Sequence, residues 1–139
     1  MKMNKLLLIF FLFFSVRNVQ AQTVAEQLQK MEEQYATFLK SYPDSNAYYK
    51  YFLFQVDSLQ TNTSQKIKSK AAEKEKAAFI KDDFAWNKKK GAYFKKMDET
   101  FKYNLQEKIW TKDMIRVTYQ QKAEFILKRI KAILKELKE

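Results

Sequence analysis

The chain has 139 residues, with 27 Lys or Arg against 16 Asp or Glu, which gives a formal net charge of +11. It contains no Cys and no His, which excludes disulfides, thiol catalysis, imidazole bases and the usual zinc sites. With one Gly and one Pro, it has too few turn residues for an all-β domain, so the composition favours helices.

The N-terminus has the three parts of a secretory signal peptide, which we assign to residues 1–21. After a basic start, the apolar run LLLIFFLFFSV at 6–16 is too short for an ordinary membrane span. Val19-Gln20-Ala21 has modest or small residues where a signal peptidase reads, so we expect cleavage between Ala21 and Gln22. This ending resembles signal peptides of Bacteroidota, which implies a Gram-negative source and a mature protein in the periplasm or outside the cell.

Residues 22–139 are then the mature protein, which we expect to form a single all-α domain. Without the basic residues of 1–21, the mature protein has 24 basic and 16 acidic side chains, which gives a net charge of about +8. Because each amphipathic helix must cover its apolar stripe with another, the expected architecture is a small up-and-down bundle of about four to five helices.

The first helix is expected to begin at Thr23, because Thr23-Val24-Ala25-Glu26 matches the T-x-x-E capping box. Apolar residues then recur at helical spacing: Val24, Leu28, Met31, Tyr35, Phe38 and Tyr42. Pro43 should end this helix, because proline cannot continue the hydrogen-bond ladder.

The stretch YYKYFLF, at 48–54, has five aromatic residues in seven positions. Its residue types suit a strand, but both alternating faces would be apolar and the chain has no second convincing strand to pair with. At helical spacing the aromatics cover most of the circumference, which is typical of a buried helix. We therefore favour a central helix from about Ser45 to Leu59 and keep a strand over 47–56 as the alternative.

Residues 58–64 (SLQTNTS) are expected to form a polar loop. In the Lys-rich segment 65–76 the only large apolar residue is Ile67, so little there would anchor it to a core. This segment is expected to be either a solvated helical arm or a mobile connection, the mobile part spanning 60–76.

The second half is expected to contain a helix end at Lys88-Lys89-Lys90-Gly91, because cations followed by Gly suit a helix C-terminus. A further helix should run from 92 to about 109, and Thr111 should cap the last one. The apolar residues of the last helix fill one arc of about 120°: Ile115, Tyr119, Ala123, Ile126, Leu127, Ile130, Ile133, Leu134 and Leu137.

The last helix also carries a ridge of cations: Lys128, Lys131, Lys135 and Lys138, at spacings of three and four. This lysine ridge is a candidate surface for an anionic partner, such as a lipid head group, a polysaccharide or an acidic protein. The alternative interpretation is a solvated face that keeps the protein soluble. The same helix is cationic and amphipathic, a pattern also typical of helices that lie in a membrane interface.

Two further groups of side chains admit a functional interpretation. Tyr48, Tyr49 and Tyr51 form a candidate aromatic binding surface, since tyrosines combine apolar bodies with polar tips; the alternative is a buried spine. Asp82 and Asp83 are adjacent carboxylates, as glycoside hydrolases require, but neighbours on a helix point about 100° apart and do not face each other across a substrate. We expect this pair to be solvated.

Two short segments resemble parts of known helical families. FLKSYPDSNAYY, at 38–49, is similar to the helix–turn–helix joint of tetratricopeptide-like repeats in exported assembly lipoproteins. VTYQQKA, at 117–123, resembles the T-x-x-Q motif of small periplasmic chaperones of the Spy type, which are basic and helical. Each occurs once, and neither assigns a role to a residue.

The functional hypothesis is an exported, non-enzymatic helical module that binds another protein or holds it like a chaperone. The alternative is a basic protein that binds an anionic membrane or polysaccharide surface through its C-terminal amphipathic helix. The expected partner is thus an unidentified protein or an anionic component of the cell envelope, with no cofactor, no metal and no sequence-specific nucleic acid.

Overall fold

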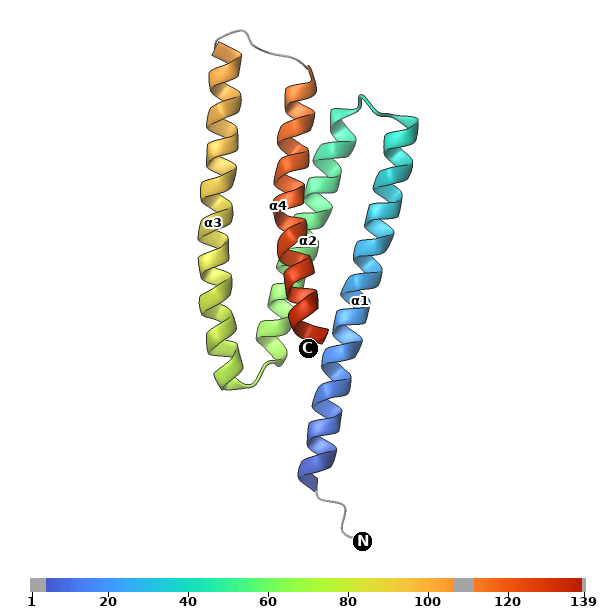
Figure 1. The fold of residues 1–139 in the computed structure, drawn as a ribbon, viewed down its shortest axis with the longest axis vertical. Helices are drawn as coiled ribbons and strands as arrows, with labels where there is room; N and C mark the ends of the chain where they lie inside the picture. The colour runs from blue at the N-terminus through green and yellow to red at the C-terminus, as the bar shows by residue number, and fades with distance from the viewer. Residues whose placement is uncertain (1–4, 107–111, 139) are drawn as a thin grey trace.

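The computed structural model describes the backbone of residues 5–106 and 112–138, and the side chains of 23–103, 106 and 113–137. The described residues form four helices and no strand: α1 (Lys5–Ser41), α2 (Asn46–Lys70), α3 (Glu73–Gln106) and α4 (Lys112–Lys138). Successive helices run in opposite directions (Figure 1). The prediction of an all-α bundle is confirmed, and the strand alternative for 47–56 is wrong.

Helix α1 starts earlier than the capping box predicts. Its helical backbone begins at Lys5 and passes through Thr23, which therefore lies inside the helix of the whole chain. The prediction of a helix start at Thr23 is wrong for this chain, because the preceding residues continue the helix. Cleavage after Ala21 remains a prediction. The N-terminal part of α1 extends beyond the ends of the other helices (Figure 1).

Pro43 ends α1 as expected, and a short turn leads to α2. Ser45 has extended backbone angles (φ −83°, ψ 99°) and accepts a hydrogen bond at its carbonyl from the N–H of Tyr48 (3.1 Å), while its side chain makes no capping bond. Arg116 of α4 braces the turn, because its guanidinium donates to the Pro43 carbonyl (2.8 Å) and lies 3.3 Å from Asp44. Contacts from a distant helix thus fix this turn.

The expected polar loop at 58–64 is instead part of α2, which continues without a break to Lys70. Gln60, Thr63 and Ser64 are buried in this helix, with exposed fractions of 2–3%. The Thr63 hydroxyl donates to the Leu59 carbonyl one turn earlier (2.7 Å), so this buried polar group has its hydrogen-bond partner within its own helix. Of the predicted mobile segment 60–76, most is helical, and only 71–72 separate α2 from α3.

The expected helix end at Gly91 is also wrong, because α3 runs through it from Glu73 to Gln106. No atom lies within 4 Å of the position that a Cβ would occupy at Gly91. Gly91 is therefore tolerated inside α3, because the residues adjacent to it in the sequence are good helix formers. The predicted cap Thr111 lies outside the described residues.

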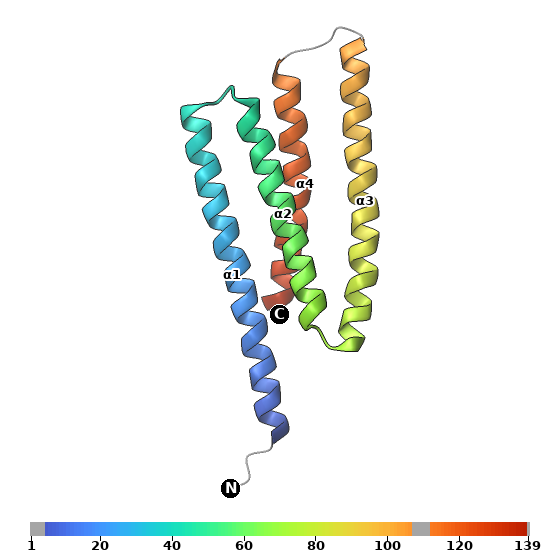
Figure 2. The same cartoon turned by 180° about the vertical axis from the view of Figure 1, so that it is seen from behind.

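The hydrophobic core belongs to three of the four helices. Its buried residues come from α1, α2 and α4: Val24, Leu28, Phe52, Val56, Leu59, Ala123, Ile126, Ile130 and Leu134. Helices α2 and α4 form the centre, α1 and α3 flank them on opposite sides, and α1 does not touch α3 within the described residues (Figures 1 and 2). None of the described apolar side chains of α3 is fully buried. The apolar faces predicted for α1 and α4 are the core faces, except that Tyr42, predicted for the α1 face, is 55% exposed.

Candidate functional site

The lysine ridge lies on the solvent side of α4. Lys128, Lys131 and Lys135 are exposed, whereas the side chain of Lys138 lies outside the described residues. The Lys131 ammonium is 3.3 Å from a carboxylate oxygen of Glu32 on α1. Part of the ridge's charge is therefore already balanced within the molecule.

The apolar face of α4 is covered by the core. Ile126 and Ile130 are completely buried, and Ile133 is 2% exposed. An interfacial helix must present its apolar face to the bilayer. An anionic partner of the folded chain would consequently meet the exposed lysines of this helix and not its covered apolar face.

The three candidate tyrosines occupy different environments. Tyr49 is 5% exposed, and its hydroxyl donates to the Pro43 carbonyl (3.2 Å). Tyr48 is half-buried and stacks on Phe38, with ring centroids 4.6 Å apart, whereas Tyr51 is 51% exposed. Tyr49 is therefore buried, as the spine interpretation requires, whereas Tyr51 is exposed, and a binding role for it remains a prediction.

Stacked rings extend the buried part of this spine towards α1. The Tyr35 ring lies parallel to that of Phe52, with centroids 3.9 Å apart, and meets the Tyr49 ring edge-on at 5.8 Å. Burial raises the pKa of the Tyr35 phenol, although a hydrogen bond with Gln120 partly offsets this. A hydrogen bond with Tyr49 is also the main reason that the pKa of Arg116 is raised. These aromatics hold α1, α2 and α4 together.

A buried charged cluster, which the sequence patterns did not predict, lies where α2, α3 and α4 meet. Asp83, expected to be solvated, has a side chain only 3% exposed. It accepts a hydrogen bond from the Ser64 hydroxyl (3.0 Å) and lies 2.5 Å from the Lys68 ammonium. Ser64 in turn accepts from Gln60 (2.9 Å). The sequence signal for this cluster was a Gln-x-x-x-Ser-x-x-x-Lys spacing on one face of the supposed loop and arm.

Ion pairs connect α3 to its two neighbours. Three of them have separations of 2.6 Å: Lys90–Asp57, Lys122–Asp98 and Arg129–Asp82. In each pair the cation is largely buried, with a side chain at most 19% exposed, and the carboxylate is more exposed. Helix α3 is thus attached through ion pairs, whereas α1, α2 and α4 pack on one another through aliphatic side chains.

Aromatic rings complete the attachment of α3. The Tyr93 ring stacks on that of Phe125 from α4, with centroids 4.5 Å apart. Lys90 lies 5.4 Å above the Trp86 ring and Lys122 lies 5.0 Å above the Phe94 ring. Each of these cations contacts both a carboxylate and a ring, which stabilises a partly desolvated charge.

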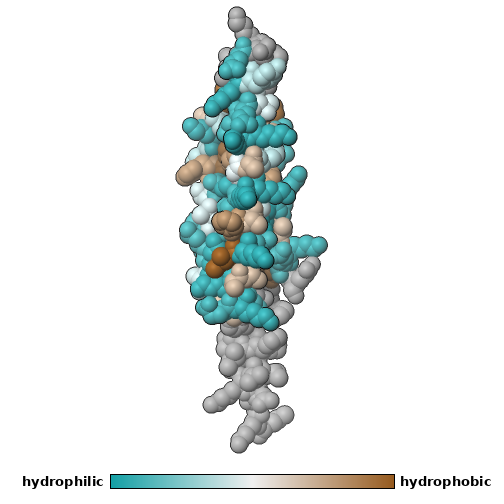
Figure 3. Space-filling view, turned by 90° about the vertical axis from the view of Figure 1, so that its left-hand side faces the viewer, coloured by the Kyte–Doolittle hydropathy of each residue, from teal (hydrophilic) through white to brown (hydrophobic). Residues whose placement is uncertain are grey.

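Several large apolar side chains remain exposed on the outside of α2 and α3. Tyr51 and Phe54 are 51% and 68% exposed, and Ile80 and Phe84 are 45% and 72% exposed. We call these four residues the apolar surface. The members of each pair are neighbours on their helix, at spacings of three and four. Seen from the side on which α3 lies, the molecule is mostly hydrophilic with separate hydrophobic areas (Figure 3).

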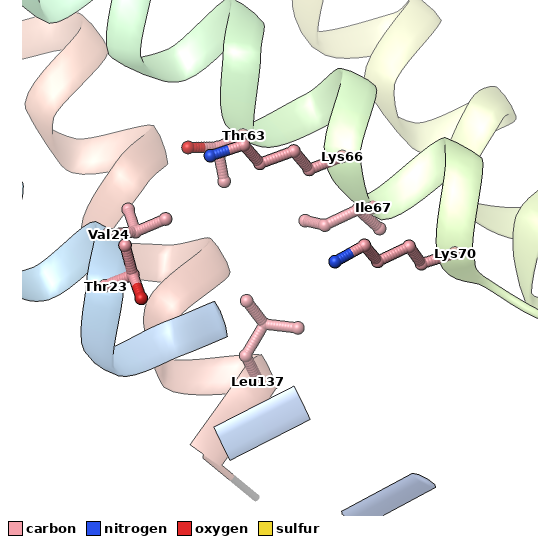
Figure 4. A pocket seen from close by; sticks show the side chains of 7 residues that line it. All are labelled: Thr23, Val24, Thr63, Lys66, Ile67, Lys70 and Leu137. Atoms are coloured by element: carbon pink, nitrogen blue, oxygen red, sulfur yellow. The ribbon is translucent and has the colours of Figure 1, made fainter. Parts of the chain in front are cut away.

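A pocket of about 290 Å³ lies between α1, α2 and α4, near the C-terminal end of α2. Its apolar lining includes Val24, Ile67 and Leu137, one residue from each helix. The side chains of Lys66 and Lys70 reach across it from α2 (Figure 4). The pocket therefore combines an apolar interior with two cations at its edge.

The described part of the chain lacks the features of two other kinds of site. No group of three or more His, Cys, Asp or Glu among the described residues is arranged to hold a metal ion. Within the same residues, no helix has both the length and the hydropathy needed to cross a bilayer. No family model, curated protein or solved structure matches this chain.

Proposed function

We propose that this is an exported, non-enzymatic helical protein that holds apolar segments of other proteins in a chaperone-like manner. The observation that carries the proposal is the exposure of the apolar surface, Tyr51, Phe54, Ile80 and Phe84, on two adjacent helices. Single exposed apolar residues are common on soluble proteins, but pairs one helical turn apart expose a larger apolar area, which is typical of binding surfaces.

The charge around the apolar surface supports the same function. Lys50 and Lys81 are exposed and directly adjoin Tyr51 and Ile80 in the sequence. Cations beside aromatic rings suit an unfolded chain, which presents carboxylates and apolar side chains together. Burial of apolar side chains would supply the affinity, while the positive field would speed encounter.

The test is suppression of client aggregation, measured by light scattering with an unfolded client at 0.15 M and 0.5 M salt. We expect suppression at both, because apolar contact is not screened by salt. The double variant Phe54→Ser/Phe84→Ser should lose most of this activity and keep the wild-type circular dichroism spectrum, since both rings are mostly exposed. Lys128→Gln/Lys131→Gln is the control and should retain it; equal activity in all three proteins would contradict the proposal.

The exposure of Lys128, Lys131 and Lys135 supports a second candidate function, binding of an anionic membrane or polysaccharide surface. Because the apolar face of α4 is covered, such binding would be electrostatic and should collapse between low salt and about 0.15 M, where the Debye length is about 8 Å. Sedimentation with neutral and anionic liposomes separates the two functions. The ridge variant Lys128→Gln/Lys131→Gln would then lose liposome binding without losing client holding.

A further inference from the structure

We propose that the pocket between α1, α2 and α4 is a binding site for a single-chain anionic amphiphile, specifically a medium-chain fatty acid. This site goes beyond the proposed holding function and does not depend on it. It lies near the C-terminal end of α2, whereas the apolar surface lies on the outside of α2 and α3.

The interior of the pocket suits an alkyl chain. Val24 is 4% exposed and Ile67 and Leu137 are half-buried, so the three form an apolar lining contributed by three different helices. Thr63 also lines the pocket, but its hydroxyl is already bonded to the Leu59 carbonyl (2.7 Å). The hydroxyl therefore does not require a polar ligand group at that point.

The edge of the pocket suits a carboxylate. Lys66 and Lys70 are one helical turn apart, and both side chains extend over the hollow towards α1 (Figure 4). No described carboxylate lies within 4 Å of either ammonium group, whereas the adjacent Lys68 contacts Asp83 at 2.5 Å. Two like charges at this spacing repel each other, and one anion between them would relieve the repulsion.

Removal of the predicted signal peptide would add positive electrostatic potential at the same edge of the pocket. Thr23 of α1 also lines the pocket, two residues after the predicted cleavage position. Removal of residues 1–21 would start α1 there, and the positive end of the helix dipole would then lie beside the pocket, even with two N–H groups bonded in the predicted Thr23–Glu26 capping box. The site is thus expected to be most favourable to an anion in the mature protein.

The volume limits the ligand to one chain of moderate length. A methylene group is about the size of a water molecule, which occupies about 30 Å³ in the liquid. A pocket of about 290 Å³ therefore accommodates about ten such groups. This is at the small end of the range for ligand sites and is too small for the two chains of a phospholipid.

The test is calorimetric titration of residues 22–139 with saturated fatty acids below their micelle concentration. This form omits the apolar run 6–16, which would itself bind lipid, and it retains every residue of the hydrophobic core. Affinity should rise about fourfold for each added methylene from hexanoate to decanoate, and then level off as the chain outgrows the pocket. Decanoate should bind at least tenfold more tightly than decanol or decyltrimethylammonium.

Two variants localise the binding. Lys66→Gln/Lys70→Gln should weaken decanoate at least tenfold and leave decanol unchanged, whereas Lys89→Gln/Lys96→Gln on α3 removes the same charge and should have no effect. Ile67→Trp should block both ligands; if this variant does not fold, the lysine comparison decides alone. Equal binding of the anionic, neutral and cationic ligands, or equal loss in both lysine double variants, would overturn the site. Loss of decanoate binding with client holding intact would leave the proposed function standing.

Discussion

Asp82 and Asp83 are chemically identical and adjacent in the sequence, but their side chains lie in different environments. Asp83 is 3% exposed and contacts Ser64 and Lys68, whereas Asp82 is 61% exposed and pairs with Arg129. Asp83→Ala should lower the free energy of unfolding by about 3 kcal/mol, because it leaves a cation near the interface without its partner. Asp82→Ala should cost less, about 1 kcal/mol, because Asp82 itself is exposed and the buried Arg129 would keep Asp83 as a second carboxylate, 3.8 Å away. Urea denaturation measures both values, and similar costs for the two variants would contradict the buried, paired environment described for Asp83.

Ile130 and Lys131 provide a second contrast between neighbours, on α4. Ile130 is completely buried in the core, and the Lys131 side chain is 59% exposed beside Glu32. Ile130→Asp should cost more than about 4 kcal/mol, because it replaces core packing with an unpaired buried charge, and should abolish the helical circular dichroism signal. Lys131→Asp should change stability by about 1 kcal/mol or less. A folded Ile130→Asp protein would show that the register of α4 is wrong.

Gly91 gives a prediction at the level of one helix. It lies inside α3 with no atom near the position of a Cβ, so Gly91→Ala removes backbone freedom from the unfolded chain without creating a clash. The free energy of unfolding should rise by about 0.5–1 kcal/mol. If α3 ended at Gly91 in a left-handed cap, the same substitution would instead be destabilising, so thermal or urea unfolding of this one variant distinguishes a continuous helix from a broken one.

The attachment of α3 gives the second prediction at this level. Because α3 contributes ion pairs and half-buried rings while the other helices contribute the aliphatic core, its local opening should cost less than global unfolding. Hydrogen exchange should be faster in α3 than in α4. At 1 M salt, where the Debye length is about 3 Å, exchange in α3 should accelerate more than exchange in α4, because the carboxylates of these pairs are exposed and can be screened. Equal protection of α3 and α4 at both salt concentrations would refute a charge-mediated attachment.

The elements also show which sequence signals were reliable. The apolar periodicity of α1 and α4 predicted their core faces, because helical spacing places such residues on one side whatever the neighbouring helix is. The breaks at 58–64 and Gly91 were predicted wrongly, because local turn and cap preferences amount to about 1 kcal/mol and are overridden by the continuing helix. The buried Asp83 cluster was missed because the spacing of Gln60, Ser64 and Lys68 indicates only its α2 half, and the partner Asp83 lies 19 positions from Ser64.

At the scale of the whole molecule, apolar and charged side chains stabilise different contacts between the helices. Helices α1, α2 and α4 form the aliphatic core, and cations from α2, α3 and α4 join α3 to it. The stretch YYKYFLF contributes to both the core and the surface, since Tyr49 and Phe52 are buried and Tyr51 and Phe54 are exposed. The sequence predicted this stretch as a buried helix. The surface alternative included Tyr51, but which of these residues face outward could not be predicted, because the number of neighbours covering α2 depends on how the helices assemble.

The most direct test of the central claim, that client chains bind the apolar surface of α2 and α3, is backbone amide chemical-shift mapping of residues 22–139 with an unfolded client at 0.5 M salt. The largest shifts are predicted around Tyr51, Phe54, Ile80 and Phe84. Shifts confined to the α4 segment around Lys128, Lys131 and Lys135, and lost as salt is raised, would contradict the claim and favour an anionic partner.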